Sequence, residues 1–238
     1  MLDLNRANLS IASINVAVNH AIDRAVMQAA ELPRPYLGAS IVGGECLRKV
    51  QYDWWCAPTH SARLREILER GHYFEERSRQ LLSKAGFEFA PSEALAFSAV
   101  NGLLRGHADG KIIASPVLPE LTYPLLWEHK AVNAKNWRAL ERDGLEKTFP
   151  QYAAQVALYQ AYLDVTNPAL FTALNSDTCE RLHFLVPFDA ERAQAWSDRA
   201  VTIIEATRAS ELLPRFTDDG GDWRCNLCSH RERCWGQK

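Results

Sequence analysis

The sequence predicts an α/β protein in which a mixed sheet carries helices on its faces. Three observations support this prediction. Apolar side chains recur at helical spacing in 9–30 and 61–84. Five short segments of strand composition, separated by Gly, Pro and Asn, lie between residues 87 and 130. Helical and strand patterns then alternate to about residue 209. This order of elements is typical of a mixed sheet packed against helices.

The composition is that of an ordinary folded protein. With 238 residues, 47% of them hydrophobic and 24% charged, the chain can bury a full core, and we expect one domain. The formal net charge of -2 gives no overall attraction to nucleic acid, so a DNA contact would depend on local positive charge. Such charge occurs in 61–84, interspersed with glutamates, and in the C-terminal tail. The basic residues there are Arg63, Arg65, Arg70, Arg77, Arg79, Lys84, Arg224, Arg231 and Arg233.

The sequence also indicates the cellular compartment. No apolar run approaches the length that spans a membrane, and charged or polar residues interrupt the apolar positions of the first thirty residues. We therefore expect a cytoplasmic protein without a membrane partner.

The elements follow in order. In 9–30 the apolar spacing predicts an amphipathic helix, either an arm that contacts a neighbouring subunit or, as we favour, a helix on the protein's own core. A helix over 61–84 places His72 beside Glu75 and Glu76, three and four residues further on. Strands are predicted over 87–89, 94–99, 103–106, 111–114, 125–130, 170–175 and 182–187, and helices over 134–141, 150–163 and 189–209.

One stretch, 106–130, combines residues that suit metal chemistry. Asp109 precedes Glu128 by nineteen residues, and Glu128 and Lys130 project from the same face of the predicted strand while His129 points to the other. Two carboxylates can hold a hard divalent cation, and an ammonium group can position a water and stabilise charge on a phosphate. Alone, the same residues also suit a hairpin turn followed by a strand with one solvated face.

Two helices add polar residues. Gln151, Gln155 and Tyr159 recur every four residues and line one face of a largely apolar helix, where they need hydrogen-bond partners or, for a half-exposed helix, water. His72 suits either a satisfied core histidine or, beside the glutamates, a ligand of manganese or magnesium, with Glu75 as a weaker second candidate.

The C-terminal tail holds three cysteines within ten residues, Cys225, Cys228 and Cys234. In a reducing compartment such a group indicates metal binding rather than disulfides. Two sites compete: a zinc site closed by His230, and an iron–sulfur cluster closed by a fourth cysteine, for which Cys46 after its Gly-Gly turn is the candidate. We expect the other two, Cys56 and Cys179, to be ordinary buried thiols.

Taken together, these motifs resemble one family over residues 40–235. The chain is similar to RecB-like nucleases of the PD-(D/E)XK superfamily, in the iron–sulfur branch that includes CRISPR adaptation exonucleases, the AddB nuclease domain and small phage nucleases. The matching positions, in chain order, are Cys46, His72, Asp109, Glu128, Lys130, Gln155, Tyr159, Cys225, Cys228 and Cys234. The hairpin has Ala108-Asp109 where the family pattern has Pro-Asp, a change that removes no ligand.

The resemblance implies a restriction-endonuclease-like fold in a single domain over 1–238. It would comprise an N-terminal arm (1–35), a nuclease core (61–209) and two cluster-binding segments (40–60 and 210–238). His72, Asp109 and Glu128 would hold Mg²⁺ or Mn²⁺, Lys130 would orient the water, and Gln155 and Tyr159 would hold Lys130 or the phosphates. The four matching cysteines would bind a structural 4Fe–4S cluster, with Zn²⁺ as the alternative.

The implied activity is hydrolysis of DNA, single- or double-stranded, by an exonuclease acting at ends. Two alternatives stay open: a catalytically silent module that binds DNA or a protein partner, and a zinc-stapled structural protein. The resemblance also implies recombination or CRISPR-related protein partners and a phage or prophage origin with action in the host cytoplasm. The sequence leaves both a monomer and an oligomer open.

Overall fold

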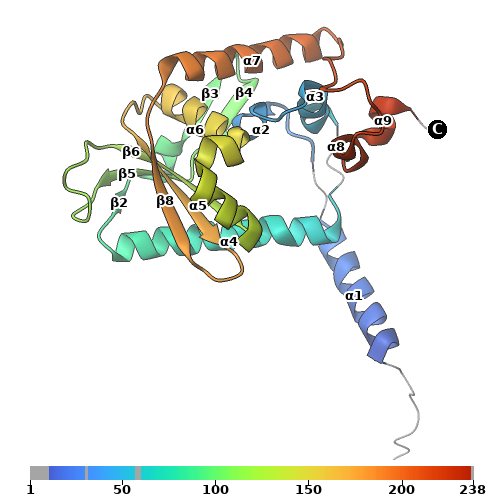
Figure 1. The fold of residues 1–238 in the computed structure, drawn as a ribbon, viewed down its shortest axis with the longest axis horizontal. Coiled ribbons are helices and arrows are strands. Elements are labelled where there is room, and N and C mark those ends of the chain that lie inside the picture. The colour runs from blue at the N-terminus through green and yellow to red at the C-terminus, as the bar shows by residue number, and fades with distance from the viewer. Residues whose placement is uncertain (1–10, 30–31, 57–59, 237–238) are drawn as a thin grey trace, which may run out of the picture.

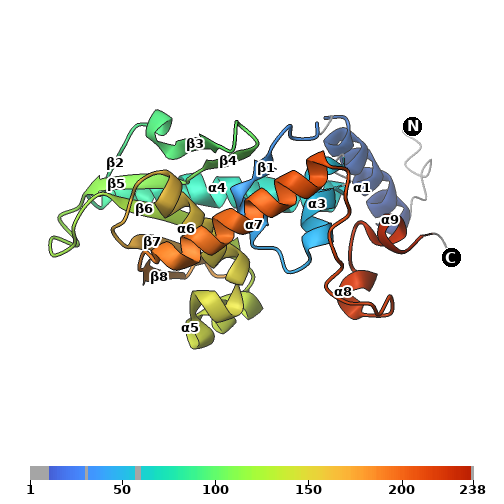
Figure 2. The same ribbon diagram turned by 90° about the horizontal axis from the view of Figure 1, so that it is seen from above.

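The computed structural model describes residues 11–29, 32–56 and 60–236, and every structural statement below concerns these residues. Its main sheet has five strands in the order β2-β5-β6-β7-β8. Helix α4 (Ala62–Lys84) packs on one face of this sheet, while α5 (Ala134–Thr148) and α6 (Pro150–Tyr162) pack on the other, with α7 (Ala190–Arg208) against α6 (Figures 1 and 2). The predicted class, a mixed α/β fold with helices on both faces of the sheet, is confirmed.

The centre of the sheet is the parallel pair β6 (Leu125–Val132) and β7 (Ala169–Asn175), connected through α5 and α6. Every residue of β7 is buried, as expected for a strand covered on both faces. The outer strands β5 (Gly110–Ala114), β2 (Glu88–Phe89) and β8 (Arg181–Val186) pair antiparallel to their neighbours. Because helices cover both faces of the sheet, a polar side chain on β6 or β7 must find its hydrogen-bond partner within the protein.

A second, three-stranded sheet has the order β1-β4-β3. It comprises β1 (Leu37–Gly38), β3 (Ala96–Ala99) and β4 (Leu104–His107). The sequence predicted β3 and β4 but did not separate them from the main sheet. It also extended β3 to residue 94, whereas Ser92–Leu95 form a 3-10 turn.

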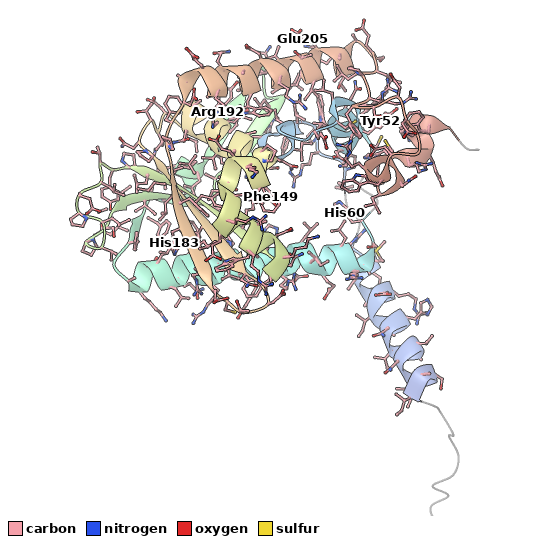
Figure 3. All side chains as sticks on the ribbon, viewed as in Figure 1. Tyr52, His60, Phe149, His183, Arg192 and Glu205 are labelled. Carbon is pink, nitrogen blue, oxygen red and sulfur yellow. The ribbon has the colours of Figure 1, made fainter. Side chains whose placement is uncertain are left out.

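Side chains at the helix ends explain where several helices begin. Ser61, Asn133 and Asp189 each accept a hydrogen bond from the backbone N–H three residues further on and so cap α4, α5 and α7. Pro150 occupies the first turn of α6, where no backbone N–H donor is needed. Helix α5 continues to Thr148, beyond the predicted end at residue 141, and joins α6 at Phe149 (Figure 3).

Four short helices were not predicted: α2 (Ala39–Val42), α3 (Leu47–Trp55), α8 (Trp223–Asn226) and α9 (Arg231–Trp235). They belong to the segments that contain the cysteines. Each is shorter than three turns, so the helical repeat of apolar residues is too brief to recognise.

Helix α1 (Ile11–Met27) forms as predicted but does not lie on the core, so that expectation was wrong. None of its residues is buried, and its contacts are with α4, from which it projects away from the body (Figures 1 and 3). Within the part of the chain described, no helix is long and apolar enough to cross a membrane.

Candidate active site

Asp109, Glu128 and Lys130 lie together at the junction of β5 and β6. Lys130 Nζ donates to Glu128 Oε1 at 2.5 Å, and the backbone N–H of His129 donates to Asp109 Oδ2 at 2.7 Å. Gly110 pairs with Trp127 across the two strands, which places Asp109 beside the middle of β6. The predicted alternation of faces along β6 is therefore observed.

Helix α6 contributes the next residue of the site. Gln155 Nε2 donates to Glu128 Oε1 at 2.6 Å and lies 3.2 Å from the hydroxyl of Tyr159. Gln155, Tyr159 and Glu128 are all buried. The close approach of Tyr159 depends on Gly106, since a Cβ there would lie 2.4 Å from the Tyr159 ring.

Gln151 takes no part in this contact. Although it lies one turn before Gln155, its side chain donates to the backbone oxygen of Ser40 at 2.9 Å. The predicted row of polar residues along α6 is therefore split: Gln155 and Tyr159 belong to the site around Glu128, whereas Gln151 contacts α2.

Asp109 and Glu128 together carry more negative charge than the ammonium group of Lys130 neutralises. Burial raises the pKa of Asp109, and burial together with the charge of Asp109 raises the pKa of Glu128 to about 8. Although burial alone would lower the pKa of Lys130, the charges of Glu128 and Asp109 raise it. We take Glu128 as the group that needs the extra positive charge, since it is fully buried.

Two oxygens support this conclusion. Glu128 Oε2 and Gln155 Oε1 are buried without a hydrogen-bond partner in the structure. An unpartnered buried oxygen is costly, and a carboxylate oxygen with its acceptor capacity unused suits a hard cation. The donor chemistry of Asp109 and Glu128 therefore fits Mg²⁺ or Mn²⁺.

Helix α4 brings His72 and Glu75 to the same region. His72 Nδ1 lies 3.7 Å from Glu75 Oε2, but the side chain of His72 is 82% exposed. Burial raises the pKa of Glu75, and the charge of Asp109 adds to the shift. Among the described residues no group of three or more His, Cys, Asp or Glu side chains is already placed to hold one metal ion. His72 thus lies at the rim of the site, whereas the Glu75 side chain is more buried, at 32% exposed. Glu76 is exposed, as expected.

Part of the site lines a cavity of about 580 Å³, and neither Glu128 nor Lys130 is among the lining residues. Asp109, Gln155 and Tyr159 line it together with His72 and Glu75. Sequence analysis missed its other polar residues, which are Arg34, Tyr36, Ser40, Arg105 and His107. It also missed Tyr152, whose ring lies 5.3 Å from Lys130 Nζ. No periodicity marks these five residues, because Arg34 and Tyr36 lie on a loop, Ser40 lies in the single-turn helix α2, and Arg105 and His107 lie in the separate three-stranded sheet.

On the opposite face of β6, His129 packs under α4. Its Nε2 is 3.1 Å from Ser78 Oγ, and burial lowers the pKa of His129 to about 3, so the ring is neutral. This contact joins the strand that carries Glu128 to the helix that carries His72 and Glu75.

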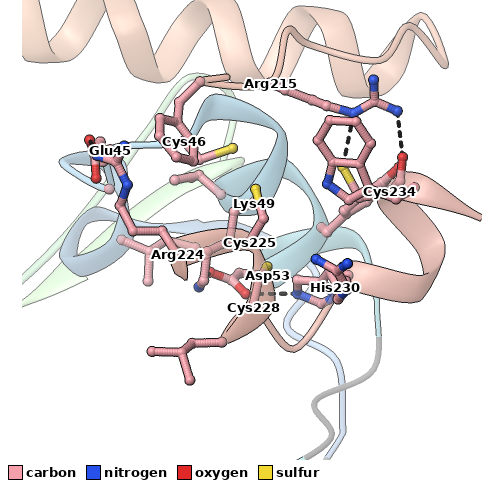
Figure 4. A pocket seen from close by; sticks show the side chains of 18 of the residues that line it. Glu45, Cys46, Lys49, Asp53, Arg215, Arg224, Cys225, Cys228, His230 and Cys234 are labelled. Carbon is pink, nitrogen blue, oxygen red and sulfur yellow. Dashed lines mark hydrogen bonds and ion pairs between the residues drawn. The ribbon is translucent and has the colours of Figure 1, made fainter. Parts of the chain in front are cut away.

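The four cysteines of the predicted cluster line a second cavity, of about 310 Å³. Cys46 precedes α3, whereas Cys225, Cys228 and Cys234 come from the tail, so segments far apart in sequence meet here (Figure 4). Burial raises the pKa of the Cys228 thiol, and the neighbouring Asp53 and Cys46 add to the shift.

Positive groups surround these thiols. Lys49, Arg215 and Arg224 line the same cavity, and Arg215 Nε donates to Cys234 Sγ at 3.3 Å (Figure 4). His230 Nε2 lies 2.8 Å from Asp53 Oδ1. The donor set fits an iron–sulfur cluster: each thiolate binds a different iron, so the sulfurs surround a volume rather than converge on one point.

The remaining two cysteines differ from expectation. Cys56 is partly exposed and Cys179 is exposed, so neither is a buried core thiol. Cys179 follows the turn after β7 and itself has a positive φ of 63°.

No protein-family model matches the sequence, and no curated protein matches it. Solved structures are similar. The crystal structure of SSO0001 has a TM-score of 0.52 at 13% identity, over 93% of this chain and 98% of that chain. An alkaline exonuclease from Laribacter hongkongensis, LHK-Exo in complex with dAMP, has a TM-score of 0.52 at 14% identity, over 80% of this chain and 93% of that chain. The chain therefore shares the mixed α/β fold of these two structures.

Proposed function

We propose that this protein is a metal-dependent deoxyribonuclease that acts as an exonuclease at the cavity lined by Asp109. The observation that carries the proposal is the arrangement around Glu128: one carboxylate oxygen is held by Lys130 and Gln155, and the other is buried and unpartnered beside Asp109. A surface hairpin would leave these acids in water. The fold shared with an alkaline exonuclease supports the same proposal.

Asp109 and Glu128 would hold the cation, with Glu75 and His72 as contributors from α4. The bound cation would supply Lewis-acid stabilisation of charge on the phosphate and would lower the pKa of a water. Lys130 would orient that water and donate to the phosphate oxygens. Gln155 would hold Glu128 in place, and Tyr159 would support Gln155 from the next turn of α6.

For the second cavity we propose a 4Fe–4S cluster bound by Cys46, Cys225, Cys228 and Cys234. Arg215, whose Nε donates to Cys234 Sγ, would balance part of the thiolate charge, whereas Lys49 pairs with Asp53 and Arg224 with Glu45 and Asp222. The cluster would join the segment before α3 to the C-terminal tail and so stabilise the fold, as structural metals do. The zinc alternative needs His230, whose Nε2 already contacts Asp53.

The test is degradation of labelled single- and double-stranded DNA with Mn²⁺ or Mg²⁺, with and without a chelator. The proposal predicts release of nucleotides that the chelator abolishes. Absence of metal-dependent degradation under every condition would refute the nuclease, and retarded but intact DNA would indicate a binding module instead. Protein purified without air should be brown with an iron–sulfur cluster and colourless with zinc.

A further inference from the structure

The cavity that contains Asp109 also contains two arginines that the proposed chemistry does not use. Arg34 comes from the loop before β1, and Arg105 comes from β4. The sequence placed local positive charge on 61–84 and on the tail, but these two side chains are the arginines that line the cavity. They therefore add positive charge to the proposed substrate site beyond that of Lys130.

Arg105 is held in position from two sides. Its Nε donates to the backbone oxygen of Gly102 at 2.9 Å, and its guanidinium lies over the ring of Tyr36 at 5.0 Å. Both contacts leave the terminal nitrogens of the guanidinium available to an anion. A stacked guanidinium is also restricted in its rotations, so less conformational entropy is lost when it binds.

Arg34 lies close by, over Gly38. One of its terminal nitrogens is 3.4 Å from the position where a Cβ of residue 38 would be, and Gly38 lines the same cavity. Neither arginine forms an ion pair with a carboxylate among the described residues. Asp109 and Glu75 line the same cavity, but neither pairs with these two arginines. The two guanidinium groups can therefore bind an anion there.

We propose that Arg34 and Arg105 form a phosphate subsite, which binds the DNA backbone phosphate adjacent to the one that is cleaved. The proposal rests on the proposed nuclease function and adds to it the residues that hold the neighbouring phosphate. Guanidinium groups match phosphate oxygens with two parallel hydrogen bonds. The ring of Tyr36 stays under Arg105 and supports it, so this subsite recognises the backbone rather than a base.

The test measures binding apart from catalysis. In an Asp109→Asn background without divalent cation, fluorescence anisotropy gives the Kd of a single-stranded oligonucleotide at several salt concentrations. Arg34→Gln and Arg105→Gln should each raise Kd about tenfold, as expected for loss of a charge-assisted hydrogen bond. Each should also reduce the slope of log Kd against log salt by about 0.7, the contribution of one phosphate contact on a single strand.

Two further variants complete the design. Arg208→Gln removes an exposed arginine at the end of α7 and should leave Kd and the salt slope unchanged. Arg105→Lys keeps the charge and should restore the slope while Kd stays raised. The subsite is refuted if Arg34→Gln and Arg105→Gln match Arg208→Gln while the protein with Asp109 intact still degrades DNA with Mn²⁺. Absence of that degradation would instead refute the nuclease itself.

Discussion

Gln155 and Glu128 form the contact that connects α6 to the central strand of the sheet. Gln155 Nε2 is 2.6 Å from Glu128 Oε1, the same oxygen that accepts from Lys130. The second oxygen of Glu128 is thereby left without a hydrogen bond in a fully buried position. The arrangement holds one oxygen firmly and presents the other to a cation.

Removing the Gln155 amide should weaken the site without unfolding the protein. In Gln155→Ala we expect the rate of DNA degradation to fall about 10- to 100-fold, the usual loss when a residue that orients a metal ligand is removed. The concentration of Mn²⁺ needed for half-maximal rate should rise, because Glu128 is less well oriented. Steady-state rates across a Mn²⁺ titration measure both effects.

Gln151→Ala is the matched control, since Gln151 has the same side chain one turn earlier and contacts Ser40 instead. It should keep the rate and the Mn²⁺ dependence. Equal losses in the two variants would show that the effect comes from the helix and not from Glu128.

The raised pKa of Glu128 predicts how stability depends on pH in metal-free protein. In the folded state its pKa is about 8 against an ordinary value of 4.5, so between about pH 4.5 and pH 8 the folded protein retains a proton that the unfolded chain has released. The free energy of unfolding should therefore fall as pH rises through this window. The Tm of wild type should drop from pH 5.5 to pH 8 by about 3 °C or more beyond the drop seen in Glu128→Gln.

A divalent cation should reverse this loss. Mn²⁺ replaces the proton, so its addition should raise Tm more at pH 8 than at pH 5.5, and should do so less in Glu128→Gln. Identical pH profiles for wild type and variant would contradict the assignment of Glu128 as the uncompensated acid.

We expect removal of a cysteine from the second cavity to lower the stability of the protein rather than its rate of DNA degradation. Cys234→Ser should lose visible absorption and iron, and its Tm should fall by at least about 5 °C, because the tail is no longer tied to the segment at Cys46. Cys179→Ser, which changes an exposed thiol outside the cavity, should change neither. A cluster-free Cys234→Ser protein with unchanged Tm would refute the structural role.

Comparison of sequence and structure shows which features local pattern can specify. Alternation along β6 placed Glu128 and Lys130 on one face and His129 on the other, and the four-residue spacing placed Gln155 beside Tyr159 on α6, because both relations are internal to one element. The family resemblance implied that Gln155 would hold Lys130 or the phosphates, whereas in the structure its side chain donates to Glu128. The partner of Gln151 was not predicted, since it depends on how α6 packs against α2.

The features that were missed depend on long-range packing. Arg34 and Arg105 meet because β1 pairs with β4 in a separate small sheet, a relation between residues that are far apart in the sequence. Helix α1 has the pattern of a core helix, but the packing leaves it without a buried residue. His72 was placed at the metal by resemblance, whereas in the structure its side chain is 82% exposed and Glu75 is the more buried of the two.

The central claim is that Asp109, Glu128 and Lys130 hydrolyse DNA, and Lys130→Met tests it most directly. The change removes the ammonium group but keeps a long apolar stem beside Tyr152, so the fold should persist. With saturating Mn²⁺ and a labelled oligonucleotide, nucleotide release should fall about 10²- to 10³-fold relative to wild type in protein that circular dichroism shows to be folded, the usual loss when one group that stabilises transition-state charge is removed. Release by folded Lys130→Met at the wild-type rate would contradict the account.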